Sequence, residues 1–236
     1  MIMSLVVFVT ILVLAIPSAM IFIPLAAVTG NVGPLYAAVC FIVSAGYWVA
    51  GIHIKVAGRE QVPAGRACIF MANHVSNLDA PALISRLPGR TSAFTKRSVY
   101  KLPLFGYCLK LAEYIPVDRT GNAASAKASV AAAARLLEKG LHITTFVEGA
   151  RSRDGRMLPF KKGPFYLAMG TGAPCIPVSI YGTETMMAKG SFGIKPGTAH
   201  IVFHAPVYPS DYATREELSQ AVRAAIASGL PEWMRA

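Results

Sequence analysis

The stretch from Phe70 to Pro81 contains a histidine and an aspartate whose spacing limits how they can meet. It reads Phe-Met-Ala-Asn-His-Val-Ser-Asn-Leu-Asp-Ala-Pro, so His74 and Asp79 are five positions apart. On a continuous helix, five residues turn by about 500°, which would leave the two side chains about 140° apart. They can therefore meet only if the chain turns between them.

The flanking residues predict such a turn. The apolar run Ala67 to Met71 is typical of a strand, and Asp79 followed by Pro81 is typical of a helix start. We expect His74 to leave the strand in a loop and Asp79 to open the next helix, with its carboxylate facing the imidazole. Asp79 would then accept one ring N–H, and the other nitrogen would be free to act as a base.

Each of these two residues also has a simpler explanation. A lone histidine near a helix start is usually a polar loop residue, and an aspartate at that position is usually an N-cap. The pair alone is therefore weak support for a catalytic site, and a second polar motif is needed.

That second motif is Phe146-Val-Glu-Gly-Ala-Arg-Ser-Arg, which follows the strand-like run Ile143–Val147. Gly149 at a strand end lets backbone N–H groups approach an anion, and Arg151 and Arg153 offer forked donors for phosphate oxygens. A solvated basic loop is the simpler alternative. Combined with the histidine motif, the stretch predicts a phosphate-binding loop.

The first 54 residues differ sharply in composition from the rest of the chain. No Lys, Arg, Asp or Glu occurs before Lys55, and two apolar runs, Leu5–Val28 and Leu35–Ala50, flank a short polar turn. The first run is long enough to cross a hydrocarbon core, which needs roughly 20 residues, and the second is marginal. We therefore divide the chain into membrane-inserted helical segments, 1–54, and a catalytic domain, 55–236.

The way these runs meet the membrane stays open. Pro17 and Pro24 would break or kink the first run, so a re-entrant or half-inserted hairpin competes with a spanning pair. A cleaved signal peptide is disfavoured, because no basic residue precedes the first run and a second run follows it. Lys55 and Arg59 directly after the second run place the remaining domain on the cytoplasmic side.

The segment 55–236 carries all 23 basic and 12 acidic residues and hence the whole net charge of +11. Such a balance suits a surface of anionic membrane lipids. Nucleic acid is disfavoured, since the apolar N-terminus holds the domain at a bilayer and no recognition motif occurs. The four cysteines are scattered, so we expect neither a metal site nor a disulfide framework.

The same segment alternates strand-like and helical patterns, which predicts an α/β sheet layered with helices. Two helices are clear: Ser125–Lys139, stopped by Gly140, and Thr214–Ser228, opened by a capping box. Six strands are expected, at Ile52–Val56, Ala67–Met71, Ser92–Thr95, Ile143–Val147, Ile176–Tyr181 and His200–His204.

The two polar motifs together resemble those of the glycerolipid acyltransferases, most closely the bacterial 1-acylglycerol-3-phosphate O-acyltransferases. Two lesser stretches follow in the order typical of that family, one running from Lys96 to Arg119 and one from Ala173 to Ser179. The resemblance covers roughly residues 55 to 182. It implies a single mixed sheet layered with helices, an N-terminal apolar helical hairpin and residence at the bacterial inner membrane.

The resemblance also implies roles for individual residues. His74 corresponds to the base that takes the proton from the sn-2 hydroxyl of lysophosphatidic acid, and Asp79 to its orienting partner. The substrate-binding positions are Glu148, Gly149, Arg151, Arg153 and Arg119. No metal or cofactor is implied, because acyl-CoA or acyl-[acyl carrier protein] is the co-substrate that donates the acyl group.

Three residues depart from the family pattern. Val147 and Ala150 stand where proline and threonine are common, and Glu113 stands where glycine is usual. They motivate an alternative acceptor, such as a lyso-aminolipid. A third hypothesis is a non-catalytic protein that binds anionic lipid. A serine hydrolase is a poor alternative, because no G-x-S-x-G elbow occurs and Ser76 has no base other than its neighbour.

Overall fold

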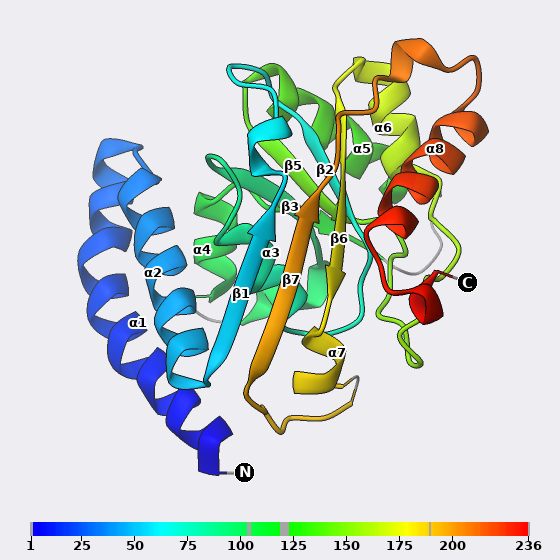
Figure 1. Cartoon of the computed structure of the whole chain (residues 1–236). Coiled ribbons are helices and arrows are strands. Elements are labelled where there is room, and N and C mark those ends of the chain that lie inside the picture. The colour runs from blue at the N-terminus through cyan, green and yellow to red at the C-terminus, as the bar shows by residue number, and fades with distance from the viewer. Residues whose placement is uncertain (1, 103–104, 119–122, 189, 236) are drawn as a thin grey trace.

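In the computed structural model, the chain is described at residues 2–102, 105–118, 123–188 and 190–235. It opens with two apolar helices, α1 (Ile2–Thr29) and α2 (Gly33–Val49), which form a hairpin along one side of the molecule (Figure 1). Pro17 and Pro24 lie inside α1, so the expected break does not occur at either position. Each proline removes only one N–H donor, and the other hydrogen bonds of the turn carry the helix through.

A seven-stranded mixed sheet follows, in the order β1-β7-β6-β2-β5-β3-β4. Six strands confirm the sequence prediction to within a few residues, and β4 was not predicted because a three-residue strand has too little pattern to detect. The strands are β1 (Ile52–Ala57), β2 (Ile69–Ala72), β3 (Thr91–Lys96), β4 (Ile115–Val117), β5 (His142–Phe146), β6 (Cys175–Tyr181) and β7 (Gly197–Phe203).

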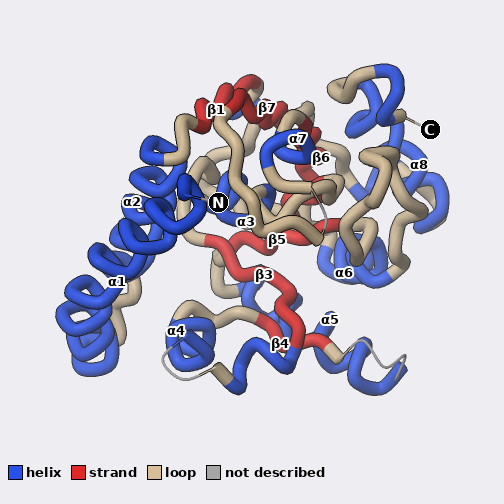
Figure 2. Tube along the Cα trace, turned by 90° about the horizontal axis from the view of Figure 1, so that it is seen from below, coloured by secondary structure: helices blue, strands red, loops and turns tan. Residues whose placement is uncertain are grey.

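The direction of the strands decides where loops gather. Strands β2, β3, β4, β5 and β6 run parallel, whereas β7 runs antiparallel to β6 and pairs in parallel with β1. The carboxyl ends of the five parallel strands therefore share one edge, where ligands bind in sheets of this kind. Figure 2 looks onto this edge, with α7 and the start of α1 in front of it.

Helices cover both faces of the sheet (Figure 1). Helices α5, α6 and α8 pack on one face, and the N-terminal hairpin, α3 and α7 lie on the other. Thr214 and Glu217 form the predicted capping box of α8, and Gly140 follows α5 with a positive φ of 82°. The helices after the hairpin are α3 (Asp79–Ile84), α4 (Phe105–Leu111), α5 (Ala123–Glu138), α6 (Gly163–Thr171), α7 (Thr183–Met186) and α8 (Arg215–Ser228).

The central strand β2 divides the core into two clusters. Ile69 and Met71 point to the cluster under α5, α6 and α8, whereas Phe70 and Ala72 point to the cluster on the other face. All four side chains are fully buried, as expected for a parallel strand covered on both sides. The loop that follows β2 therefore leaves from a rigid position.

The hairpin belongs to the second cluster rather than standing apart from the domain. Val7, Tyr47 and Ala50 are buried with residues of β2, β6 and β7. The Tyr47 hydroxyl also donates a hydrogen bond of 2.6 Å to the carbonyl oxygen of Leu78, the residue before α3. The hairpin thereby holds the turn that leads into Asp79.

We expect Tyr47→Phe to lower the free energy of unfolding by about 0.5 to 1.5 kcal/mol, because the buried carbonyl of Leu78 loses one of its two donors and keeps only the N–H of Ala82. Thermal unfolding in detergent micelles measures the change. Tyr208→Phe, at an exposed position, is the matched control. Equal stability of the two variants would show that the hairpin does not hold this turn.

Candidate active site

His74 and Asp79 meet at the carboxyl edge of the sheet, as the turn between them requires. Strand β2 ends at Ala72, His74 lies in the loop that follows, and Asp79 is the first residue of α3. The Nδ1 atom of His74 lies 2.8 Å from Oδ2 of Asp79. The expected loop-and-helix arrangement of this pair is therefore present.

Asp79 is fully buried and has four hydrogen-bond donors. Its Oδ2 accepts from His74 Nδ1 and from the backbone N–H groups of Val75 and Ser76, at 2.7 and 2.8 Å. Its Oδ1 accepts from the Thr183 hydroxyl at 2.5 Å. The backbone donors precede the helix, so Asp79 is not an N-cap of α3. Such a set of donors offsets the hydration that a carboxylate loses on burial.

The His74 ring is fixed on one face and accessible at one nitrogen. It stacks on the ring of Phe146, with centroids 4.0 Å apart and planes 20° apart. Because Nδ1–H donates to Asp79, Nε2 carries the lone pair, and it has no hydrogen-bond partner among the described residues. The side chain is 19% exposed. This nitrogen can therefore accept a proton from a bound molecule.

Glu148 connects the two polar motifs through the backbone. Its Oε1 accepts from the N–H of His74 and its Oε2 from the N–H of Leu158, both at 3.0 Å. The N–H of Ser152 in turn donates to the carbonyl of His74 at 2.8 Å. The sequence resemblance predicted a substrate contact for Glu148, but both of its carboxylate oxygens accept from backbone groups.

Burial sets the protonation of Glu148. The side chain is 2% exposed, and this desolvation raises the pKa of its carboxyl to about 7. The N–H groups of Leu158 and His74 and the charge of Arg223 act in the opposite direction, because they favour the carboxylate. Glu148 therefore changes charge close to neutral pH.

Three of the remaining predicted positions, Gly149, Arg151 and Arg153, lie in the Glu148 loop, which we define as residues 147–162. Gly149 has a φ of +68°, and a Cβ there would lie 2.9 Å from Cγ of Lys161, so only glycine fits without strain. Arg151 is half-buried and Arg153 is exposed. Arg119 lies outside the described residues.

Sequence reasoning missed Thr183 and the stacking role of Phe146. Thr183 follows β6 and lies more than a hundred positions from Asp79, with no motif to connect the two. Its one sequence signal is Gly182 before it, which has a φ of +91° and whose Cβ would clash with the carbonyl oxygen of Thr198. The glycine brings the strand end close enough for the hydroxyl to reach Asp79.

The alternative nucleophiles are occupied or inert. The Ser76 hydroxyl is buried and donates to the carbonyl of Met187 at 2.7 Å. Burial raises the pKa of the Cys68 thiol to about 11 and that of Cys175 to about 12. Within the part of the chain that the structure describes, no three His, Cys, Asp or Glu side chains cluster as metal ligands. The arrangement suits base catalysis by His74.

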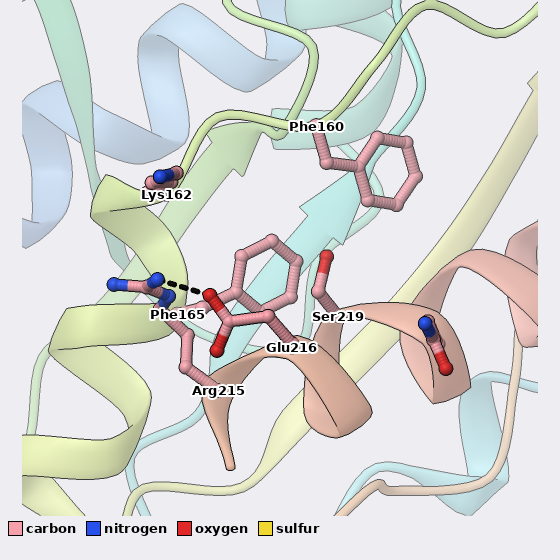
Figure 3. A pocket seen from close by; sticks show the side chains of 7 residues that line it. Phe160, Lys162, Phe165, Arg215, Glu216 and Ser219 are labelled. Carbon is pink, nitrogen blue, oxygen red and sulfur yellow. Dashed lines mark hydrogen bonds and ion pairs between the residues drawn. The ribbon is translucent and has the colours of Figure 1, made fainter.

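Two surface cavities lie near the Glu148 loop. One of about 150 Å³ adjoins the His74 loop and is lined by Val75, Ser152, Arg153, Asp154, Gly155, Glu184 and Ala188. The other, of about 250 Å³, lies between α6 and α8 (Figure 3) and is lined by Phe160, Lys162, Phe165, Arg215, Glu216, Ser219 and Gln220. The larger cavity contains neither His74 nor Asp79, so volume alone does not locate the chemistry.

Comparisons with known proteins find one family. The family model described as Acyltransferase matches residues 53–181. A 1-acyl-sn-glycerol-3-phosphate acyltransferase of Limnanthes douglasii is 35% identical over 165 residues, 70% of this chain and 58% of that protein. The human 1-acyl-sn-glycerol-3-phosphate acyltransferase alpha is 30% identical over 173 residues, 72% of this chain and 60% of that protein. The matches thus span less than two thirds of either relative's length.

A crystal structure from Thermotoga maritima shares the fold. The 1-acyl-sn-glycerophosphate (LPA) acyltransferase PlsC superposes with a TM-score of 0.82 and covers 97% of this chain and 95% of its own. Its sequence identity is 24%, so this likeness concerns the fold alone. It confirms the single mixed sheet preceded by apolar helices.

We expect Thr183→Val to reduce the free energy of unfolding by about 1 to 3 kcal/mol, because Oδ1 of the buried Asp79 loses its hydroxyl donor. Chemical denaturation measures the loss. Thr185→Val, on the same helix but exposed, is the control. A Thr183→Val protein as stable as the control would remove Thr183 from the support of Asp79.

Proposed function

Because the chain belongs to the acyltransferase family, we propose that it moves a fatty acyl group from a thioester to the sn-2 hydroxyl of 1-acylglycerol-3-phosphate, which yields phosphatidic acid. The observation that carries this proposal is the His74–Asp79 pair, with Nδ1 held at 2.8 Å and Nε2 free to accept a proton. The curated relatives with this activity support the choice of acceptor.

The reaction proceeds by direct transfer. Nε2 of His74 takes the proton of the acceptor hydroxyl while that oxygen attacks the thioester carbonyl carbon. The tetrahedral intermediate then collapses, the carbon–sulfur bond breaks, and the leaving thiolate takes the proton back from the imidazolium. Asp79 keeps the ring in the required tautomer and stabilises its positive charge. The donor is acyl-CoA or an acyl carrier protein, since both present the same thioester.

We assign binding of the acceptor to the Glu148 loop. Arg151 and Arg153 carry guanidinium groups suited to phosphate oxygens, and Gly149 lets the loop backbone come close. Glu148 serves this site indirectly, because its carboxylate holds the backbone of His74 and Leu158 together. We assign it a positioning role instead of a contact with the acceptor.

Glu113 does not favour a different acceptor. It ends the α4 turn with a φ of 58°, the conformation that glycine usually supplies. Its carboxylate pairs with Lys139 at 3.5 Å and with Arg90 at 3.7 Å. These partners hold Glu113 at the surface, so its charge has a structural explanation that needs no lyso-aminolipid.

We expect His74→Gln to lower kcat by about 10²- to 10⁴-fold, the usual contribution of a positioned base, without loss of folding. His53→Gln, at an exposed position of β1, is the matched control and should keep full activity. Full activity of purified His74→Gln protein would overturn the mechanism.

The acceptor is identified in the same assay by offering a panel of lysolipids to the wild-type protein and weighing the products by mass spectrometry. Phosphatidic acid is the expected principal product. A preference for a lyso-aminolipid would replace the proposed acceptor. Lipid binding without turnover, weakened by salt and unaffected by His74→Gln, would indicate the non-catalytic alternative.

Membrane attachment through α1 is the second part of the proposal. This helix has a mean hydropathy of 2.8 over its most apolar window, and only 11% of that window is buried in the protein. It is the one described helix long enough to cross a membrane, since α2 has 17 residues. Helix α2 contacts the domain near both of its ends, where the Tyr36 hydroxyl donates to the carbonyl of Ile84 at 3.3 Å and that of Tyr47 to the carbonyl of Leu78 at 2.6 Å. We therefore favour a half-inserted hairpin over a spanning pair.

The side on which the hairpin tip lies distinguishes the two arrangements. In vesicles with the domain outside, a half-inserted hairpin leaves Asn31→Cys without any contact with the lumen, so a maleimide confined to the lumen should not label it. A spanning pair would expose this position, between α1 and α2, to the luminal reagent. Ser210→Cys, exposed on the domain, reports that the domain faces outward.

A further inference from the structure

Beyond the two motifs, one arginine on the C-terminal helix is connected to the His74 loop. We propose that Arg223 on α8 is a positioning residue for His74, acting through Leu158 and Glu148. The activity assay for this inference rests on the proposed function. The measurement specific to the inference is the acidic limb of the pH profile, the range in which activity falls as the pH is lowered.

A continuous series of hydrogen bonds joins Arg223 to His74. The Arg223 Nη1 donates to the carbonyl of Leu158 at 2.9 Å, and the N–H of Leu158 donates to Glu148 Oε2 at 3.0 Å. The other oxygen of Glu148 accepts from the N–H of His74 at 3.0 Å. Arg223 thus holds the carbonyl of Leu158, the residue whose N–H engages Glu148.

A second contact fixes the same segment. The guanidinium of Arg223 lies over the ring of Phe160, 5.2 Å from its centroid, and Phe160 stacks on Phe165 of α6 at 6.2 Å. A cation over an aromatic face is stabilising, more so when partly desolvated. Arg223 therefore fastens residues 158 and 160 to α8, and a lysine cannot reproduce both contacts because it lacks the planar fork.

The charge of Arg223 also acts on Glu148. It lowers the pKa of this buried carboxyl, whereas Asp79 at the start of α3 raises it. The other charged residues of the Glu148 loop are Arg151, Arg153, Asp154, Arg156, Lys161 and Lys162, and the stem of Lys161 lies against Gly149. Only the carboxylate has two full acceptors for the N–H groups of His74 and Leu158, since protonation turns one oxygen into a hydroxyl.

The direction of the pH effect follows from these contacts. As pH falls through the pKa of Glu148, the carboxyl gains a proton and its hold on the His74 backbone weakens. Removal of the Arg223 charge raises that pKa, so the weakening begins at a higher pH. Activity should therefore decline earlier on the acidic side in a variant that lacks this charge.

The test compares Arg223→Met and Arg223→Lys with Arg215→Met in the full chain. Arg215 is a matched control, because it lies on the same helix, over the Tyr166 ring at 4.1 Å, and pairs with Glu216. We expect Arg223→Met to reduce kcat by about 10-fold or more, as misplacement of a reacting group does. Its acidic limb should move to higher pH, whereas Arg223→Lys should keep the limb near its original position and Arg215→Met should change neither.

A double variant separates positioning from general loss of packing. In a Glu148→Gln background, adding Arg223→Met should no longer move the acidic limb, because the group through which it acts cannot titrate. A limb that does not move in Arg223→Met, or moves equally with and without Glu148, would overturn the inference. Absence of any lysophosphatidic acid turnover in the wild-type protein would instead overturn the proposed function.

Discussion

The structure depends on the burial of one carboxylate, Asp79, in a place where water cannot reach it. A buried charge without partners is strongly destabilising, so the surrounding chain must supply donors. It does so from two segments: the His74 loop, through two backbone N–H groups and the imidazole, and α7, through the hydroxyl of Thr183. The segments that follow β2 and β6 therefore meet at this one side chain. The same contacts orient the ring of His74.

Glu148 is also a buried carboxyl group, but fewer hydrogen-bond donors compensate its burial. It has two backbone donors where Asp79 has four donors in all, and desolvation raises its pKa to about 7. The site therefore contains two buried acids in different conditions, one fully supported and one poised between charged and neutral. The second connects the His74 loop to the Glu148 loop, so geometry and protonation are coupled in this part of the molecule.

Much of this arrangement was predictable from sequence, because strong local patterns specified it. The five-position spacing required a turn, the apolar runs located six strands, and Thr214 with Glu217 marked the start of α8. Thr183 and Arg223 could not be predicted, since each reaches the site through packing of distant elements. Asp79 was correctly placed at a helix start, yet its donors showed that its carboxylate serves the loop before the helix.

The apolar hairpin has a consequence for how the protein can be handled. Its inner face supplies Val7, Tyr47 and Ala50 to the same hydrophobic cluster as Phe70 and Phe203. The boundary near residue 54 is therefore a change in composition, and the residues on its two sides share one core. A fragment that starts after this boundary would expose a contiguous apolar surface on the face of the sheet that β2 shares with the hairpin. Solubilising this protein is better approached by changing the outward face of the first helix than by cutting it away.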